Sequence, residues 1–203
     1  MNINKIAGPM VEAWACEKFH AVMEDEANKY CLINVEAQQR LGMSDVILQF
    51  KKKRKVETGV TAEVDVKATS EDFASSGKSP NITSFKRIRS AYVGDPDYIF
   101  IILSLKHKVY STKNKKTGLV DGIMEIVAHN AYDLKLLSSS DISYNPALGT
   151  GQIQVRDIHY VTLVERSTWE FCQLLDKKFM NSRNGFDQWL TLATKNGWIK
   201  TDE

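Results

Sequence analysis

The stretch TAEVDVKATS, residues 61–70, alternates apolar and charged side chains. Valine, threonine and this alternation favour a β-strand, in which side chains two residues apart share a face. Val64 and Val66 therefore point to one face, which suits a hydrophobic core. The opposite face presents the charged side chains Glu63, Asp65 and Lys67. Such a face is either a solvent-exposed ion pair, as most such patterns are, or part of a reactive site.

The composition is that of one globular domain without a strong charge bias. The chain has 203 residues, of which 43% are hydrophobic and 26% are charged, and its formal net charge is +2. This small charge neither requires nor excludes a nucleic-acid partner. The distribution is more informative, because KKKRK at 51–55 and KNKK at 113–116 are dense basic runs. Each run is either a phosphate contact or a solvated loop.

The cysteines and the apolar segments exclude several classes of protein. Cys16, Cys31 and Cys172 are far apart and show no C-x-x-C spacing, so neither a zinc site nor a disulfide framework follows. The N-terminus lacks the apolar core of a signal peptide. The longest apolar run, YIFIILSL at 98–105, is too short to cross a bilayer. We therefore expect a soluble, cytoplasmic protein without a membrane partner.

Periodicity and end signals predict an α/β (α+β) fold. Apolar spacing and end signals predict helices over 9–29, 80–92, 167–180 and 186–197. The end signals are Pro9 and Pro80 at first helical positions, Ser79 as a cap, and a Ser167–Glu170 capping box. Alternation or continuous apolar runs predict strands over 44–50, 60–68, 98–105, both arms of 107–127, and within 152–164. Less regular segments are read as a short helix or turn at 34–41, a helix at 128–138 and a loop at 139–151. The result is one domain, 1–203, with a central mixed β-sheet flanked by helices.

A second carboxylate lies upstream of Asp65, at the start of the first hairpin strand. A hairpin can bring Asp45 close to the strand that carries Asp65 and Lys67. Mg²⁺ prefers oxygen ligands, commonly one or two carboxylates completed by waters and substrate phosphate. A lysine beside such a site can orient a water or stabilise developing negative charge. These residues can therefore hold a hard divalent cation and a water for phosphodiester chemistry, although the stretch 61–70 alone does not decide between this site and an exposed ion pair.

Here the sequence resembles a known family. Asp45 followed by Asp65-Val-Lys67 looks like the PD-(D/E)xK nuclease motif, with Ser44 in place of its usual proline. The segment DVKATSEDFASSGKSPNITSFK is similar to the one that follows the catalytic lysine of the HincII-like type II restriction endonucleases, in the EcoRV-like branch. The resemblance to these enzymes extends to three further segments: QIQVRD, a T-W-E helix start and an N-terminal G-P-x-x-E helix. The similar segments occur in the same order, from about residue 8 to residue 180. The spacing between the two aspartates is longer here and the chain is shorter, so the recognition sequence and arm contacts are not carried over.

The resemblance implies roles for residues of the motif. Asp45 and Asp65 bind Mg²⁺ with the help of the Val66 carbonyl, and Lys67 acts near the attacking water. Read singly, Asp45 can instead be an acid at a turn before a strand, and Lys67 an exposed strand residue. Two further acids are not assigned as metal ligands. Glu63 shares the face of Asp65 farther along the strand and either supports the metal ligands from behind or is simply exposed, and Glu12 is expected on the helix surface.

The resemblance also implies a DNA-reading surface. A loop at 143–151 would read bases in the major groove, since asparagine pairs with adenine and small residues allow close approach. An ordinary Asn-Pro turn is the alternative. The candidates for DNA contact are Asn145, Ala147, Gly149 and Gly151 in this loop, Gln152, Gln154 and Arg156 on the next strand, and Lys78, Ser79 and Asn81 in a minor-groove loop. Lys86, Arg87 and Arg89 either contact phosphates or form a solvated helix face.

The sequence thus predicts a type II restriction endonuclease that hydrolyses double-stranded DNA with Mg²⁺. Its products would carry 5′-phosphate ends, blunt by resemblance, and a homodimer would place two active sites on a two-fold DNA site. Three alternatives remain. One is a repair, nicking or phage nuclease of the same fold, the second is a non-catalytic DNA-binding protein on this scaffold, and the third is a basic structural protein with a coincidental motif.

Overall fold

A five-stranded mixed sheet forms the centre of the protein, in a computed structural model that describes residues 4–39, 42–51, 59–147 and 151–199. Its strand order is β1-β2-β3-β5-β6. The strands are β1 (Leu32–Ala37), β2 (Val46–Lys51), β3 (Gly59–Ser70), β5 (Ile99–Lys113) and β6 (Val120–Asp133). Only β3 and β5 run parallel, and the other neighbours are antiparallel. The expected mixed sheet with flanking helices is therefore confirmed.

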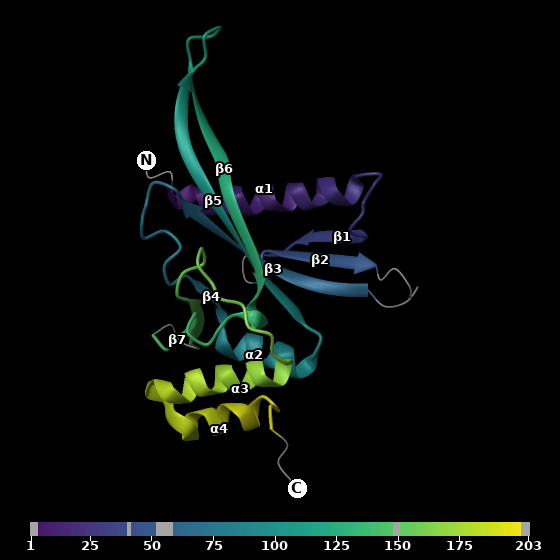
Figure 1. Ribbon diagram of the computed structural model, residues 1–203, viewed down its shortest axis with the longest axis vertical. Helices are drawn as coiled ribbons and strands as arrows, with labels where there is room; N and C mark the ends of the chain where they lie inside the picture. The colour runs from purple at the N-terminus through teal and green to yellow at the C-terminus, as the bar shows by residue number, and fades with distance from the viewer. Residues whose placement is uncertain (1–3, 40–41, 52–58, 148–150, 200–203) are drawn as a thin grey trace.

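The valine face of β3 is buried beneath the first helix. Helix α1 (Asn4–Glu24) lies across the sheet, where it contacts β1 and β3 (Figure 1). Val64 and Val66 are 2% and 3% exposed and join Val11 and Leu105 in one apolar cluster. Burial of this face fixes the register, because a shift by one residue would turn the charged side chains into the core.

A second, three-stranded sheet packs with the C-terminal helices at the other end of the molecule. Its order is β4-β8-β7, and its strands are β4 (Asn81–Ser84), β8 (Gln152–Val155) and β7 (Ile142–Asn145). The helices here are α2 (Phe85–Gly94), α3 (Thr168–Phe179) and α4 (Gly185–Lys195) (Figure 1). Ile153 and Val155 of β8 are buried in the larger apolar cluster, together with Phe85 and Phe171.

The strands β5 and β6 continue beyond the sheet as a long two-stranded arm (Figure 1). Their pairing runs from Ile101↔Asp133 to Lys113↔Val120, with an irregularity between Lys106 and His107. The sequence predicted the hairpin and its turn but a shorter extent.

Several local predictions were wrong. Helix α1 contains Pro9 and ends at Glu24, so the proline does not mark its first turn. Residues 34–37, expected in a short helix or turn over 34–41, belong to β1, which pairs with β2 through Ala37, and residues 40–41 lie outside the described residues. Ser79 is not a helix cap and has a φ of 46°, while residues 81–84 pair with β8 before α2 begins at Phe85. Residues 128–133 belong to β6, and only the short 3₁₀ turn Leu134–Leu136 follows.

Other predicted elements are confirmed with adjusted bounds. The hairpin of β2 and β3 forms, and β5 is an internal strand of its sheet. Ser167 and Glu170 make a reciprocal capping box at the start of α3. β8 is confirmed at Gln152–Val155, whereas the loop expected over 139–151 was wrong for Ile142–Asn145, which form the strand β7. After α3, a turn at Met180–Asn184 leads into α4.

Arg89 has a structural position rather than a place on a solvated face. It is 2% exposed, and its guanidinium donates from Nε and Nη2 to the two carboxylate oxygens of Asp176 on α3, at 3.0 and 3.1 Å. A paired arginine buried at a helix interface is unavailable to phosphates, so the phosphate role considered for Arg89 is wrong.

No helix within the described residues is long and apolar enough to cross a membrane.

Candidate active site

Asp45 is held at the edge of the hairpin by two backbone contacts. Its N–H donates to the Val64 carbonyl at 2.9 Å, and its Oδ2 accepts from the Val66 N–H at 2.6 Å. Because Val46 pairs with Val64, one further step of the antiparallel register places Asp45 opposite Asp65. The hairpin therefore brings together the two carboxylates that the sequence singled out.

Asp65 is a buried carboxylate with a partly satisfied side chain. It is 5% exposed, and its Oδ1 accepts a hydrogen bond from Lys67 Nζ at 2.8 Å. Its Oδ2 is buried and has no hydrogen-bond partner among the described residues. Burial raises the pKa of Asp65 to about 7, although Lys67 opposes this shift and Asp45 and Glu12 add to it. The site thus holds an oxygen that lacks a partner at a position where negative charge is costly.

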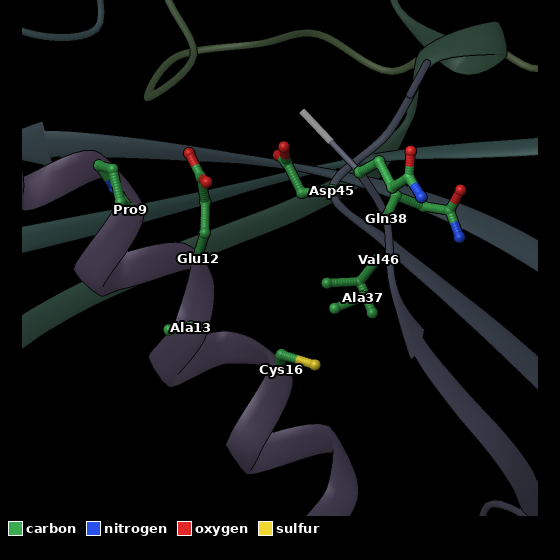
Figure 2. Close-up of a pocket in the computed structure, with 9 residues that line it drawn as sticks. Pro9, Glu12, Ala13, Cys16, Ala37, Gln38, Asp45 and Val46 are labelled. Carbon is green, nitrogen blue, oxygen red and sulfur yellow. The ribbon is translucent and has the colours of Figure 1, made fainter. Parts of the chain in front are cut away.

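A cleft of about 730 Å³ opens in front of Asp45. It is lined on one side by α1, including Glu12, and on the other by residues that lead into β2. Figure 2 shows the carboxylates of Glu12 and Asp45 directed toward the same rim of this cleft. Partial burial and the nearby Asp45 raise the pKa of Glu12, and Lys67 lowers it.

Glu12 was expected on the helix surface, outside the site, and the structure places it in the cleft. The sequence around a half-buried acid on a helix does not show that its side chain faces a cleft. Only the packing of α1 across β3 reveals it. Glu63, by contrast, shares the face of Asp65 but lies farther along the strand and pairs with Ile47.

The oxygen donors suit a hard divalent cation that is completed by water or phosphate. Across the described residues, no three acidic, histidine or cysteine side chains converge closely enough to form a metal cage from protein groups alone. Mg²⁺ sites in proteins commonly use one or two carboxylates, with the remaining positions filled by waters and substrate. The buried Oδ2 of Asp65, which has no partner, and the facing carboxylate of Asp45 fit that pattern.

The expected DNA-contacting side chains gather on one face of the three-stranded sheet. Gln154 lies between Asn81 on β4 and Ser143 on β7, and Gln152 lies between Ser84 and Asn145. Gln154 Nε2 donates to Asn81 Oδ1 at 3.0 Å and to the Ser79 carbonyl at 3.2 Å. The apolar residues of β8 face the other way, into the core. The result is a half-exposed ladder of neutral amides.

The loop after β7 is divided between exposed and buried residues. The side-chain oxygen of Asn145 accepts from the Ala147 N–H at 2.9 Å, which is the local turn that an Asn-Pro pair favours. Ala147 is exposed. Gly151 is buried at a φ of 72°, and an added Cβ there would lie 2.0 Å from Tyr144 Oη, so packing alone requires the glycine. Gly149 lies outside the described residues, as do residues 52–55 of the first basic run.

The remaining candidates lie at the edge of this face. Lys78 forms an ion pair with Asp157, and the two residues also make an isolated β-bridge. Arg156 is exposed at the end of β8. Ser79 presents its backbone carbonyl to Gln154.

Two comparisons of the sequence with known proteins agree on one family. A family model described as "Type II restriction endonuclease HpaI" matches residues 1–197. A type II restriction enzyme HpaI from Haemophilus parainfluenzae is 61% identical over 200 residues, which cover 98% of this chain and 78% of that enzyme. Among solved structures, the NlaIV restriction endonuclease superposes with a TM-score of 0.51 at 14% identity, covering 98% of this chain and 77% of that one. The last similarity supports the fold alone.

Proposed function

Since the chain belongs to the HpaI family of type II restriction endonucleases and is a site-specific deoxyribonuclease, we propose that Asp45, Asp65 and Lys67 form its catalytic centre. The observation that carries this proposal is the register of the hairpin, which sets Asp45 opposite Asp65, while Lys67 donates to Asp65 at 2.8 Å. In an exposed ion pair Asp65 would be open to solvent, whereas here it is only 5% exposed. All three residues belong to the nuclease domain that we assign to residues 1–203.

The proposed reaction is hydrolysis of a DNA phosphodiester. A water attacks the phosphorus, the bond to the 3′-oxygen breaks, and the products carry a 5′-phosphate and a 3′-hydroxyl. A bound Mg²⁺ would lower the pKa of a water and offset negative charge on the phosphate. Asp45 and Asp65 would hold the cation, with the Val66 carbonyl as a further ligand, and Glu12, which lines the same cleft as Asp45, would face its waters.

The protein groups have distinct tasks in this reaction. The Val66 N–H fixes the orientation of the Asp45 carboxylate through the 2.6 Å hydrogen bond. Lys67 orients the attacking water or stabilises the charge that develops on the phosphate. Its hydrogen bond to Asp65 holds the ammonium at the site before DNA arrives.

We assign base recognition to the amide face of the three-stranded sheet and its adjoining loop. Amide side chains can donate and accept at once, and this suits the edges of bases in the major groove. Its members are Asn81, Asn145, Gln152 and Gln154, with Ala147, Gly149, Gly151, Arg156, Lys78 and Ser79 at its margins. A homodimer would present this face twice to a two-fold DNA site. Blunt ends follow only from the likeness to the HincII-like enzymes.

A digest tests the proposal. Purified protein is incubated with long unmodified DNA and Mg²⁺, beside an EDTA control. Asp65→Asn is compared with Glu63→Gln, which removes a charge from the same face of the same strand. We expect discrete fragments from the wild type and from Glu63→Gln, and none from Asp65→Asn or with EDTA.

The other outcomes separate the alternatives. A smear would favour a repair, nicking or phage type of nuclease. Binding without cleavage would favour a DNA-binding protein on this scaffold. Fragments from Asp65→Asn would show that the catalytic centre lies elsewhere. Sequencing the fragment ends gives the recognition site and the stagger.

A further inference from the structure

A second polar pocket lies beside Lys67, on the side away from Asp45. It has a volume of about 250 Å³ and is bounded by β5, β6 and the segment after β8. The side chains that matter for its chemistry are Ser104, Lys106, Asn130, His159 and Tyr160. None of them has a role in the catalytic centre proposed above.

The sheet register places this pocket next to the catalytic centre. Lys67 on β3 pairs with Ser104 on β5, and Ser104 pairs with Asn130 on β6. Residues paired across neighbouring strands lie about 5 Å apart and present their side chains to one face. A row of polar side chains therefore leads from Lys67 directly into the pocket.

Two buried polar atoms in the pocket have no partner. Ser104 is 1% exposed, and its Oγ makes no hydrogen bond with any described residue. The Nε2 of His159 is likewise buried without a partner. The Nε2 of His159 faces the loop at Gly77, so the unsatisfied hydroxyl of Ser104 is the atom that the pocket leaves for a ligand. Buried polar groups are nearly always hydrogen-bonded, so this hydroxyl points to a ligand that binds there.

The walls of the pocket are fixed by neighbouring contacts. The backbone N–H of His159 donates to Asp157 Oδ1 at 2.9 Å, and Asn130 Nδ2 donates to the Ile158 carbonyl at 3.5 Å. An added Cβ at Gly77 would lie 2.7 Å from His159 Nε2, so the loop packs closely against the imidazole. Tyr160, which is 79% exposed, stands at the mouth.

The charge at the pocket favours an anion. Lys106 is half-buried and has no ion-pair partner in the described part of the chain. The nearby Asp157 is paired with Lys78. A hydroxyl, an ammonium and an imidazole around one small pocket are donors of the kind that bind phosphate oxygens.

We propose that this pocket binds the phosphate adjacent to the scissile one in the cleaved DNA strand. The proposal rests on the assignment of Asp45, Asp65 and Lys67 as the catalytic centre. Ser104 and Lys106 contact that phosphate, and the imidazole of His159 forms the opposite wall. By holding the neighbouring phosphate, the pocket sets the position of the strand relative to Lys67.

The test combines two protein variants with chemically neutralised phosphates. Duplexes that carry the site mapped by the digest are made with a single methylphosphonate, an uncharged analogue, at each phosphate around the cleaved bond. Binding is measured by fluorescence anisotropy in the Asp65→Asn background, with and without Ser104→Ala and Lys106→Ala. Lys108→Ala is the matched control, because Lys108 lies on the same strand and pairs instead with Glu71 at 3.6 Å.

We expect one methylphosphonate, next to the scissile phosphate, to weaken binding about tenfold, the loss of a charge-assisted contact. Ser104→Ala and Lys106→Ala each weaken binding to the normal duplex. In these variants, the methylphosphonate at that position reduces the affinity little further. Lys106→Ala also lowers the salt slope of binding by about one. Ser104→Ala leaves the melting temperature unchanged, because its Oγ has no partner to lose.

Three results would overturn the pocket proposal. In the first, the Ser104 and Lys106 variants bind the normal duplex as tightly as the protein without these substitutions. In the second, the loss of affinity from each variant adds fully to the loss from every methylphosphonate. In the third, the two losses fail to add only at a phosphate that is not adjacent to the cleaved bond. An equal loss of binding and salt slope in Lys108→Ala would show a general electrostatic effect instead. Cleavage by the Asp65→Asn background would refute the catalytic assignment separately, without affecting the coupling measured on the DNA.

Discussion

In the five-stranded sheet, the polar groups of the candidate catalytic centre are ionisable and largely buried, whereas in the three-stranded sheet they are neutral amides that stay half-exposed. Asp65 is 5% exposed and has one carboxylate oxygen without a partner. Gln154, in contrast, already donates to Asn81 and to the Ser79 carbonyl. The first arrangement leaves a carboxylate oxygen of Asp65 without a hydrogen-bond partner, so that it can bind a cation and, through it, a phosphate. The second satisfies its groups among themselves and still presents them to DNA, so changes in the two sheets should have different effects.

The largest effect is expected when the charge of Lys67 is removed. Lys67→Met keeps the length and apolar stem of the side chain but loses the donor that lies 2.8 Å from Asp65. Loss of a group that stabilises the transition state costs about 10²–10³ in rate, and we expect at least that decrease in the single-turnover cleavage rate. DNA binding in Ca²⁺ should change by less than a few fold, because the amide face is intact.

Lys135→Met is a suitable control for the loss of one positive charge, because Lys135 lies in the 3₁₀ turn Leu134–Leu136, outside the strands of both sheets. A parallel decrease in binding and cleavage for Lys67→Met would contradict the division of tasks between the two sheets.

The next effect concerns stability without metal. Burial raises the pKa of Asp65 to about 7 in the folded protein, whereas an unfolded aspartate titrates near pH 3.9. Between these values the folded state keeps a proton that the unfolded state has lost, so the free energy of unfolding falls as pH rises from about 4 to 7. Asp65→Asn removes this penalty. In EDTA the variant should match the wild type near pH 4 and exceed it by up to about 4 kcal/mol at pH 8.

Urea unfolding at several pH values measures this difference, with Glu63→Gln as the control that should not show it. Added Mg²⁺ should narrow the gap at pH 8, since a bound cation stabilises the carboxylate of the wild type alone. A wild type as stable as Asp65→Asn throughout this pH range would show that the buried charge is already compensated within the protein.

Local patterns predicted those parts of the fold in which sequence and packing agree. The alternation of residues 61–70 predicted β3 and its buried valines, and the spacing of Ser167 and Glu170 predicted the start of α3. Each of these two sequence patterns depends only on residues of a single strand or helix end. The motif residues Asp45, Asp65 and Lys67 were also found from sequence, because a hairpin brings its two strands together without further information.

The other elements depend on partners distant in the chain. Residues 34–37 contain good helix formers but pair with β2, and residues 81–84 follow a helix-start signal but pair with β8. Tertiary pairing overrides propensity in both cases. Glu12 was placed outside the site because its position depends on how α1 crosses β3, which periodicity cannot show. The same limitation applies to the phosphate pocket, whose walls come from three separate segments.

The smallest effect separates two neighbouring amides on the recognition face. Gln152 and Gln154 share one face of β8, but only Gln154 makes side-chain hydrogen bonds within the described residues. Gln152→Ala should leave the melting temperature unchanged and reduce the preference for the cognate duplex over a duplex with one altered base pair by about 1–3 kcal/mol. Gln154→Ala should reduce that preference similarly and also lower stability by up to about 1 kcal/mol, because two exposed hydrogen bonds that join β8 to the β4 segment are lost. Competition binding against non-cognate DNA measures the first quantity, and thermal unfolding the second. If Gln152→Ala weakened binding to all duplexes equally, the amide face would contact the DNA backbone, and the reading of bases would have to lie in the adjoining loop.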